Sequence, residues 1–341
     1  MRAAHTPVQR PRDAKLLVIE ANGTLQHVPR QRLADFLHAG DVLVANDAAT
    51  LPASLSGLHL RSALPIEVRL AGRRSLDADD MHEFIAIVFG AGDHRTSTEH
   101  RKPPPALRDG DALALGPLRA QVRHTLAHPR LIALHLDGTP DAIWAGIARH
   151  GKPVQYAHLP TPLALWDVWT SVAARPVAFE PPSAGFVLDW ALLHTLRERG
   201  IDFATLTHAA GLSSTGDAAL DARLPFDEPY HLPAATLDAI HAAHARGGRV
   251  VALGTTVTRA LEHAASSGLK PGDGVADQRI GAHTRLRVVD AIISGTHEPG
   301  TSHRELLRAF ASDALLSRAD AELAERGYLT HEFGDSVLIA A

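Results

Sequence analysis

The feature that most constrains the fold of this chain is a change of pattern along its length. Residues 15–57 read as strand, turn, amphipathic helix and second buried strand. Residues 58–137 contain short apolar runs separated by turn-rich gaps, with little helical periodicity. From about residue 141, helical stretches that end in glycine again alternate with buried strands, among them residues 285–294, and the helical stretch over residues 303–327 reads as broken once. An α/β chain interrupted by an all-β segment is the simplest arrangement that fits this pattern.

The interruption predicts two domains. We expect an α/β domain with a mixed sheet, formed by residues 1–57 and 149–341, and an inserted antiparallel β-barrel over residues 58–148. The chain has 341 residues, of which 45% are hydrophobic, and this is enough for two cores.

Composition excludes several classes of function. The chain has no cysteine, which excludes thiol catalysis and cysteine-ligated zinc or iron–sulfur sites. No apolar run reaches the roughly 18 residues of a transmembrane helix, and the N-terminus has no apolar signal segment. The net charge of −4 argues against a strongly basic nucleic-acid binder, although a local arginine patch stays possible. We expect a cytoplasmic, monomeric protein with no membrane partner.

Common cofactor and metal motifs are missing. The chain lacks G-x-G-x-x-G after a strand and lacks G-x-x-x-x-G-K-[ST], which argues against nicotinamide and P-loop chemistry. The stretch HEPGTSH resembles a metalloprotease motif, but its spacing is wrong and Pro299 would break the required helix. His241 and His244 lie one helical turn apart without an evident third ligand. We therefore expect no metal site.

The stretch GTTVTRALE, residues 254–262, joins a buried strand to a helix. One interpretation is structural, with Thr255 or Thr256 capping the helix and Arg259 paired with Glu262 or solvent. The other is that free N–H groups, hydroxyls and a guanidinium converge on a ligand at the end of the strand, where open α/β sheets usually bind ligands.

Four further polar loops occur in similar contexts. Asn46 and Asp47 follow one strand, Ser183 and Gly185 begin a helix, and His208 and His297 each follow a strand. Because five such loops share one position relative to the sheet, we expect them to surround one cleft.

The order of these motifs resembles a known family. The motifs occur in the order VLVAND…LP, PSAG, TH-x-x-G, GTT-x-x-R-x-L-E, VVDA followed by H-x-P, and FGD-x-x-LI. This order resembles the S-adenosylmethionine:tRNA ribosyltransferase-isomerases of queuosine biosynthesis, and the resemblance covers residues 15–341. The resemblance implies the same two-domain fold. It also implies a reaction in which S-adenosylmethionine is a substrate that donates its ribosyl carbons, and no cofactor is used. The acceptor is a 7-aminomethyl-7-deazaguanine base in tRNA, and adenine and methionine are released.

The chemistry of that reaction suggests roles for the candidate residues. A sulfonium acidifies the hydrogens of the adjacent ribose carbon, so a base near that carbon could start the reaction. His297, Glu228 and His208 are the catalytic candidates. The binding candidates share positions in the strand-end loops or the matched motifs: Asn46, Asp47, Ser183, Gly185, Gly254, Thr255, Thr256, Arg259 and Asp335. Of these, Arg259 could hold the methionine carboxylate, and the two threonines could bond the ribose or the carboxylate.

The chain departs from the family pattern at several polar positions. Two arginines of the pattern are Ala49 and Ser54 here. Arginine donates two hydrogen bonds to a phosphate, so its loss matters most for contacts with the tRNA backbone. S-adenosylmethionine is therefore the better supported partner and tRNA the less supported one. Two alternatives stay open. One is a paralogue that cleaves S-adenosylmethionine or passes its ribosyl part to a small molecule, and the other is a non-catalytic binding protein, favoured if Phe186 and Leu188 fill the cleft.

Overall fold

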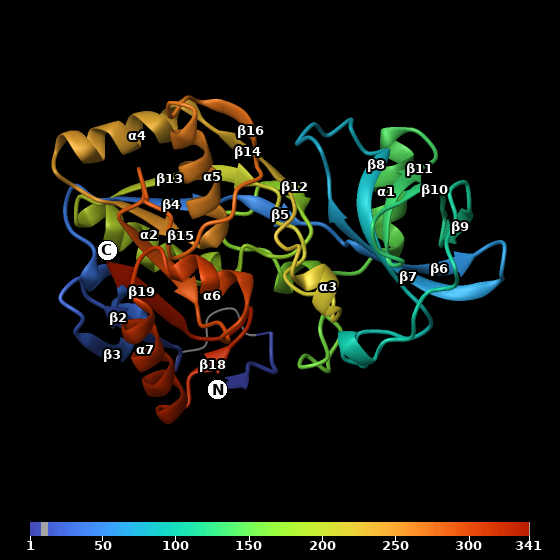
Figure 1. The fold of residues 1–341 in the computed structure, drawn as a ribbon. Helices are drawn as coiled ribbons and strands as arrows, with labels where there is room; N and C mark the ends of the chain where they lie inside the picture. The colour runs from blue at the N-terminus through green and yellow to red at the C-terminus, as the bar shows by residue number, and fades with distance from the viewer. Residues whose placement is uncertain (8–12, 341) are drawn as a thin grey trace.

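A computed structural model of the chain describes residues 1–7 and 13–340. Residues 8–12, which fall inside the first predicted segment of the α/β domain, and residue 341 lie outside this description. The described chain has the predicted fold class, a mixed-sheet α/β body joined to a closed antiparallel barrel (Figure 1). No helix among the described residues combines the length and apolar character needed to cross a membrane.

The main sheet has nine strands in the order β16-β14-β13-β4-β15-β17-β19-β2-β3. Their bounds are Gly272–Ala276, Glu228–Leu232, Asp202–His208, Val42–Asn46, Val250–Leu253, Ala291–Gly295, Ser336–Ala340, Lys15–Ile19 and Leu25–Pro29. The central strands β13, β4, β15 and β17 run parallel, whereas the pairs β16–β14, β14–β13, β17–β19 and β2–β3 are antiparallel.

Strands β4, β15 and β17 are buried on both faces, which explains their largely apolar sequences. In β4, Val42 and Val44 belong to one core cluster, and Leu43 and Ala45 belong to the cluster on the opposite face. Helices α4 (Ala234–Ala245), α5 (Thr255–Ser266), α6 (Ser302–Leu307) and α7 (Asp313–Glu325) contribute to the first cluster. Helix α2 (Trp190–Glu198) and the 3-10 helix η1 (Arg30–Phe36) contribute to the second.

The barrel closes in the order β10-β11-β8-β7-β6-β9. Its strands are β6 (Ser54–His59), β7 (Leu64–Gly72), β8 (Glu83–Phe89), β9 (Ala112–Leu115), β10 (Leu118–Thr125) and β11 (Leu131–Leu136), with η2 (Thr98–His100) in the loop after β8. Helix α1 (Pro140–His150) packs on the barrel through Ile143 and Ile147 (Figure 1).

The remaining elements lie outside the main sheet and the barrel. Strands β5 (Ala48–Thr50) and β12 (Arg175–Ala178) form a two-stranded parallel sheet, and β1 (Arg2–Ala3) pairs with β18 (Leu329–Thr330). Two further 3-10 helices are η3 (Leu165–Asp167) and η4 (Ser183–Val187), and α3 (Ala218–Asp221) is a single turn.

Three predicted elements differ from the structure in length or type. The amphipathic stretch at 28–41 and the PSAG segment form 3-10 helices rather than α-helices. The strand expected over residues 285–294 is limited to Ala291–Gly295, because the amides of Val288 and Val289 donate to Glu262 instead of to a neighbouring strand.

Candidate functional site

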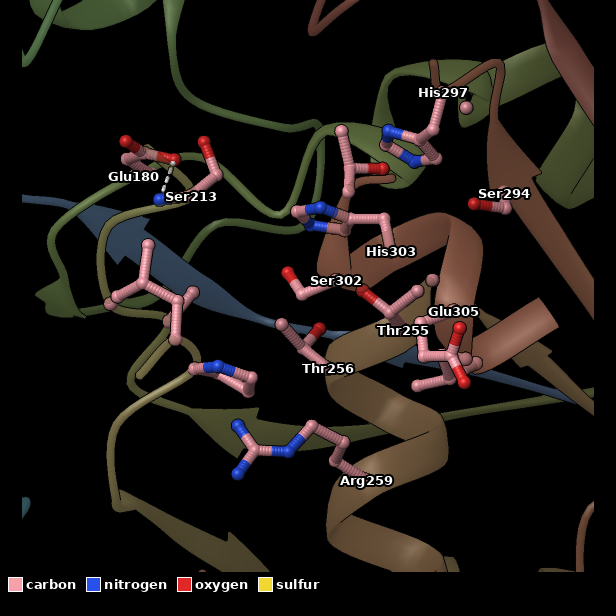
Figure 2. A pocket seen from close by; sticks show the side chains of 18 of the residues that line it. Glu180, Ser213, Thr255, Thr256, Arg259, Ser294, His297, Ser302, His303 and Glu305 are labelled. Atoms are coloured by element: carbon pink, nitrogen blue, oxygen red, sulfur yellow. Dashed lines mark hydrogen bonds between the residues drawn. The ribbon is translucent and has the colours of Figure 1, made fainter. Parts of the chain in front are cut away.

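A cavity of about 320 Å³ lies beyond the carboxyl ends of β15 and β17, between η4, the start of α5 and α6. Figure 2 shows Thr255 and Thr256 at the start of α5, with His297 and His303 above them and Glu180 and Ser213 across from them. The polar side chains on its walls are those of Glu180, Ser183, Ser213, Asp221, Glu228, Thr255, Thr256, Arg259, Arg279, Ser294, His297, Thr301, Ser302, His303 and Glu305.

The GTT turn forms one wall of the cavity. Gly254 is the residue that precedes helix α5, and its φ of 101° is a conformation that favours glycine. No threonine side chain caps the helix, so the capping interpretation is not realised. Thr255 and Thr256 instead present their hydroxyls to the cavity beside the positive end of the α5 dipole.

Arg259 is buried and its donors are used inside the protein. Its guanidinium pairs with Glu228 and donates to the carbonyls of Ala276 at 2.7 Å and Gln278 at 3.2 Å. The pairing expected between Arg259 and Glu262 is wrong, because Glu262 accepts backbone amides from residues 287–289. Arg259 therefore borders the cavity mainly as the partner of Glu228.

Glu228 and His208 form a buried group with Arg259. Glu228 begins β14 and also accepts the Gly211 N–H at 2.6 Å. Burial raises the pKa of Glu228, which Arg259 and the Gly211 amide oppose. His208 ends β13, with its Nε2 3.5 Å from Glu228 Oε2. Burial and the charge of Arg259 lower the pKa of His208 to about 3, so this imidazole is neutral at pH 7.

Two histidines stack on the opposite wall. His297 follows β17 and His303 lies in α6, with ring centroids 4.4 Å apart at an interplanar angle of 12°. Burial, followed by the charges of His303 and His331, lowers the pKa of His297 well below its usual range. Burial lowers the pKa of His303 to about 4. Both rings are neutral at pH 7 and can donate and accept hydrogen bonds.

Four predicted binding residues lie behind the cavity wall. Asn46 bonds the backbone of His208 and Ala48 and the Thr256 hydroxyl. Asp47 accepts from the hydroxyls of two threonines of β13. Asp335 accepts the amides of Lys15 and Leu329, and a Cβ at Gly185 would meet the Thr170 methyl at 2.8 Å. These residues hold the loops in place, and none of them is among the described residues that line the cavity.

Sequence reasoning missed several cavity residues, of which Glu180 is the most unusual. Burial raises the pKa of its carboxyl to about 7. The other missed residues are Ser213, Asp221, Arg279, Thr301, Ser302, His303 and Glu305. His303 could have been found, because it ends the HEPGTSH stretch that was considered only as a metal motif. Glu180 stands in FEPP, which matches no motif.

One group in the described chain has donor atoms close enough to share a metal ion. The ligand atoms of His158, His331 and Glu332 lie within 4.8 Å of one another. His158 Nε2 is 3.1 Å from Glu332, and the two imidazole rings stack at 4.4 Å. Since His158 Nε2 already bonds the Glu332 carboxylate, we interpret the group as a hydrogen-bonded network.

Comparison with known proteins identifies relatives over the whole chain. The family described as "Queuosine biosynthesis protein" matches residues 1–339. The S-adenosylmethionine:tRNA ribosyltransferase-isomerase of Thermosynechococcus vestitus is 32% identical, covering 99% of this chain and 92% of the relative. The protein of that name from Geobacter sulfurreducens is 33% identical, with 96% and 93% covered.

A solved structure is similar in fold. The S-adenosylmethionine tRNA ribosyltransferase of Thermotoga maritima matches with a TM-score of 0.52 and 22% identity, over 99% of this chain and 96% of that chain. This likeness supports the arrangement of the sheet and the barrel described above.

Proposed function

The chain belongs to the queuosine biosynthesis protein family, and on this premise we propose that it is an S-adenosylmethionine:tRNA ribosyltransferase-isomerase. It would transfer and isomerise the ribosyl part of S-adenosylmethionine onto a 7-aminomethyl-7-deazaguanine base in tRNA. Adenine and methionine would be released. The observation that carries the proposal is the cavity at the start of α5, which combines hydroxyls, neutral imidazoles and buried carboxyls.

We place the donor against the GTT turn. The hydroxyls of Thr255 and Thr256 suit the ribose diol, and the positive end of α5 suits a carboxylate. Because the donors of Arg259 are committed to Glu228 and to carbonyls, the exposed Arg279 on the same cavity is the better partner for the methionine carboxylate.

We assign the departure of adenine to the stacked histidines. A leaving purine needs a proton or a hydrogen-bond donor at its ring nitrogens. Neutral His297 and His303 can each donate one N–H while accepting at the other nitrogen. Both rings lie above the threonines in Figure 2, and we place the ribose between the two groups.

Two alternatives receive less support. Phe186 stacks on Phe333 at 5.3 Å and Leu188 lies in a core cluster, so neither is among the described residues that line the cavity. A binding protein with a filled cleft is thus disfavoured. The names of the relatives favour a tRNA acceptor over a small molecule. With tRNA as the proposed acceptor, we place the reaction in the cytoplasm and propose that the protein acts as a monomer.

The test is to incubate the purified protein with S-adenosylmethionine, alone and with tRNA that carries the aminomethyl-deazaguanine base. Mass spectrometry would follow adenine, methionine and the mass of the base. We expect release only with that tRNA, together with a mass gain on its base. Release without tRNA would support the small-molecule paralogue, and binding without release would support the binding protein.

A further inference from the structure

Glu180 is a buried carboxyl held in the cavity wall by two hydrogen bonds. It follows β12 and is 7% exposed. The Tyr156 hydroxyl donates to Oε1, and the Ser213 N–H donates to Oε2 at 3.1 Å (Figure 2). Both bonds fix the carboxyl group at the cavity and leave lone pairs on its oxygens.

The two buried glutamates of the cavity have opposite surroundings. Glu228 is paired with Arg259, whereas no ion pair to Glu180 is found in the described part of the chain. Burial raises the pKa of Glu180 to about 7. The hydrogen bond from Tyr156 opposes this rise in pKa, and the nearby charge of Glu332 adds to it. Two carboxyls with different environments on one site commonly have different chemical roles.

The charged groups around Glu180 are few. Tyr156, which donates to it, has the guanidinium of Arg69 above its ring at 5.7 Å. Glu332 faces it across a second, small cavity of about 10 Å³, which is about the volume that one water needs. Glu332 is bonded to His158, and His158 stacks on His331, which is 39% exposed on its side chain. His158 thus holds the Glu332 carboxylate beside Glu180.

We propose that Glu180 is the catalytic base of the proposed transfer reaction, taking a proton from the ribose carbon next to the sulfonium, and that Tyr156 and Glu332 set its basicity. The inference rests on the proposed function. In this step the C–H bond breaks, its electron pair stays on the carbon as a sulfonium ylide, and the carboxylate becomes a carboxylic acid. No oxidant, reductant or metal enters the balance.

The other candidates suit this step less well. His208 is fully buried beneath the cavity lining, and the carboxylate of Glu228 is committed to Arg259 and the Gly211 amide. His297 and His303 face each other at stacking distance and serve better as hydrogen-bond donors. Glu180 is the buried glutamate of the cavity that has no cation partner in the described chain, and Asp221, which also lines the cavity, is less buried and is held by Thr215.

The main test compares Glu180→Gln with the native enzyme in the assay with modified tRNA. Glutamine keeps an acceptor for Tyr156 and Ser213 but cannot take the proton. We expect turnover to fall by about 10²–10⁴-fold, with the dissociation constant for S-adenosylmethionine within about threefold of the native value. Glu83→Gln, on the barrel surface with its side chain 46% exposed, is the matched control and should keep native turnover. Turnover of Glu180→Gln within fivefold of native would overturn the assignment.

A second readout distinguishes a base from a structural residue. The acid limb of kcat/KM against pH should report the Glu180 carboxyl in the free enzyme. Tyr156→Phe removes a hydrogen bond that lowers this pKa, so the limb should move to higher pH. Glu332→Gln removes a charge that raises it, so the limb should move to lower pH. Shifts in the same direction, or none, would contradict the proposal even if Glu180→Gln did not fold.

The two levels of the account fail differently. If the native enzyme forms no modified base, the proposed function is wrong and Glu180 loses its role with it. If the native enzyme forms the product and Glu180→Gln forms it equally well, the function stands and only the base is wrong.

Discussion

Arg259 shows how the surroundings of a residue change its interpretation. Its guanidinium and the Glu228 carboxylate are both buried, and each is the main charge that compensates the other. We predict that Arg259→Ala lowers the free energy of unfolding by about 3–5 kcal/mol, because the glutamate would be left buried without a cation.

Urea unfolding checks this prediction, with Arg246→Ala as control. Arg246 pairs with Asp202 at the surface, where such a pair is worth about 0–1 kcal/mol. If Arg259→Ala has native stability but loses affinity for S-adenosylmethionine, the residue holds the ligand and our reassignment is wrong.

Glu180 should lower the stability of the native protein at high pH. Its pKa is raised from 4.5 to about 7 on folding, so between these values the folded state binds more protons and stability falls as pH rises. Each pKa unit corresponds to about 1.4 kcal/mol, so Glu180→Gln should stabilise the protein by roughly 3 kcal/mol at pH 8 and by little at pH 4.5. Denaturant unfolding at both pH values measures this, and an equal effect at both would contradict it.

At the residue scale the sequence predicted part of the cavity. Ser183, Gly254, Thr255, Thr256, Arg259, Glu228 and His297 do line it. These residues lie at the ends of strands or the starts of helices, positions that the alternation of strand and helix patterns in the sequence predicts. The partner of Arg259 could not be predicted, because Glu228 lies 31 residues away and pairing depends on how β14 is placed beside α5. Glu180 was missed because a proline-rich turn carries no signal for the direction of a side chain.

The start of helix α5 is the element on which the site depends most. Gly254 has a φ of 101°, and a Cβ there would lie 3.2 Å from the Cβ of Ala184 in η4. We predict that Gly254→Ala costs about 1–3 kcal/mol of stability and weakens binding of S-adenosylmethionine, because α5 and η4 form adjoining walls of the cavity.

Gly268 provides the control at the other end of the same helix. Its φ is 97°, but its nearest neighbour for a Cβ is the Lys270 side chain at 4.0 Å. Gly268→Ala should lose stability without a change in binding, as calorimetry would show. Equal weakening of binding in both variants would mean that general strain, and not the cavity wall, is responsible.

Elements buried on both faces were the easiest to predict. Strands β4 and β15 appear in the sequence as apolar runs. The strand-like runs of the sequence cover barrel strands β7 to β11 but not β6, and the break between α6 and α7 also followed from its pattern. The 3-10 helices η1 and η4 were predicted as α-helices. Both are short and packed against the sheet, and an amphipathic stretch of that length does not distinguish a 3.0-residue from a 3.6-residue turn.

At the scale of the whole molecule, the barrel supports the cavity. Leu212 and Leu220 are part of the barrel core, although the segment between them belongs to the loop after β13. His128 of the barrel also lies 3.2 Å from Asp217. These contacts hold the loop that carries Ser213 and Asp221, and no barrel strand contributes to the described residues that line the cavity.

Leu220→Ala tests this support. We predict a loss of about 2–5 kcal/mol in stability and a weaker affinity for S-adenosylmethionine, because the wall beside Asp221 loses its anchor. Leu134→Ala, in strand β11 of the same core, should lose similar stability and keep native affinity. Unchanged affinity in Leu220→Ala would show that the wall does not need the barrel.

The central claim is that the ribosyl carbons of S-adenosylmethionine reach a base in tRNA. The most direct measurement uses S-adenosylmethionine labelled with ¹³C throughout the ribose, incubated with the native protein and tRNA that carries the aminomethyl-deazaguanine base. After digestion to nucleosides, mass spectrometry should find all five labelled carbons on that nucleoside, with unlabelled adenine and methionine released in equal amounts. A nucleoside without label, with the label recovered in a small molecule or in intact donor, would contradict the account.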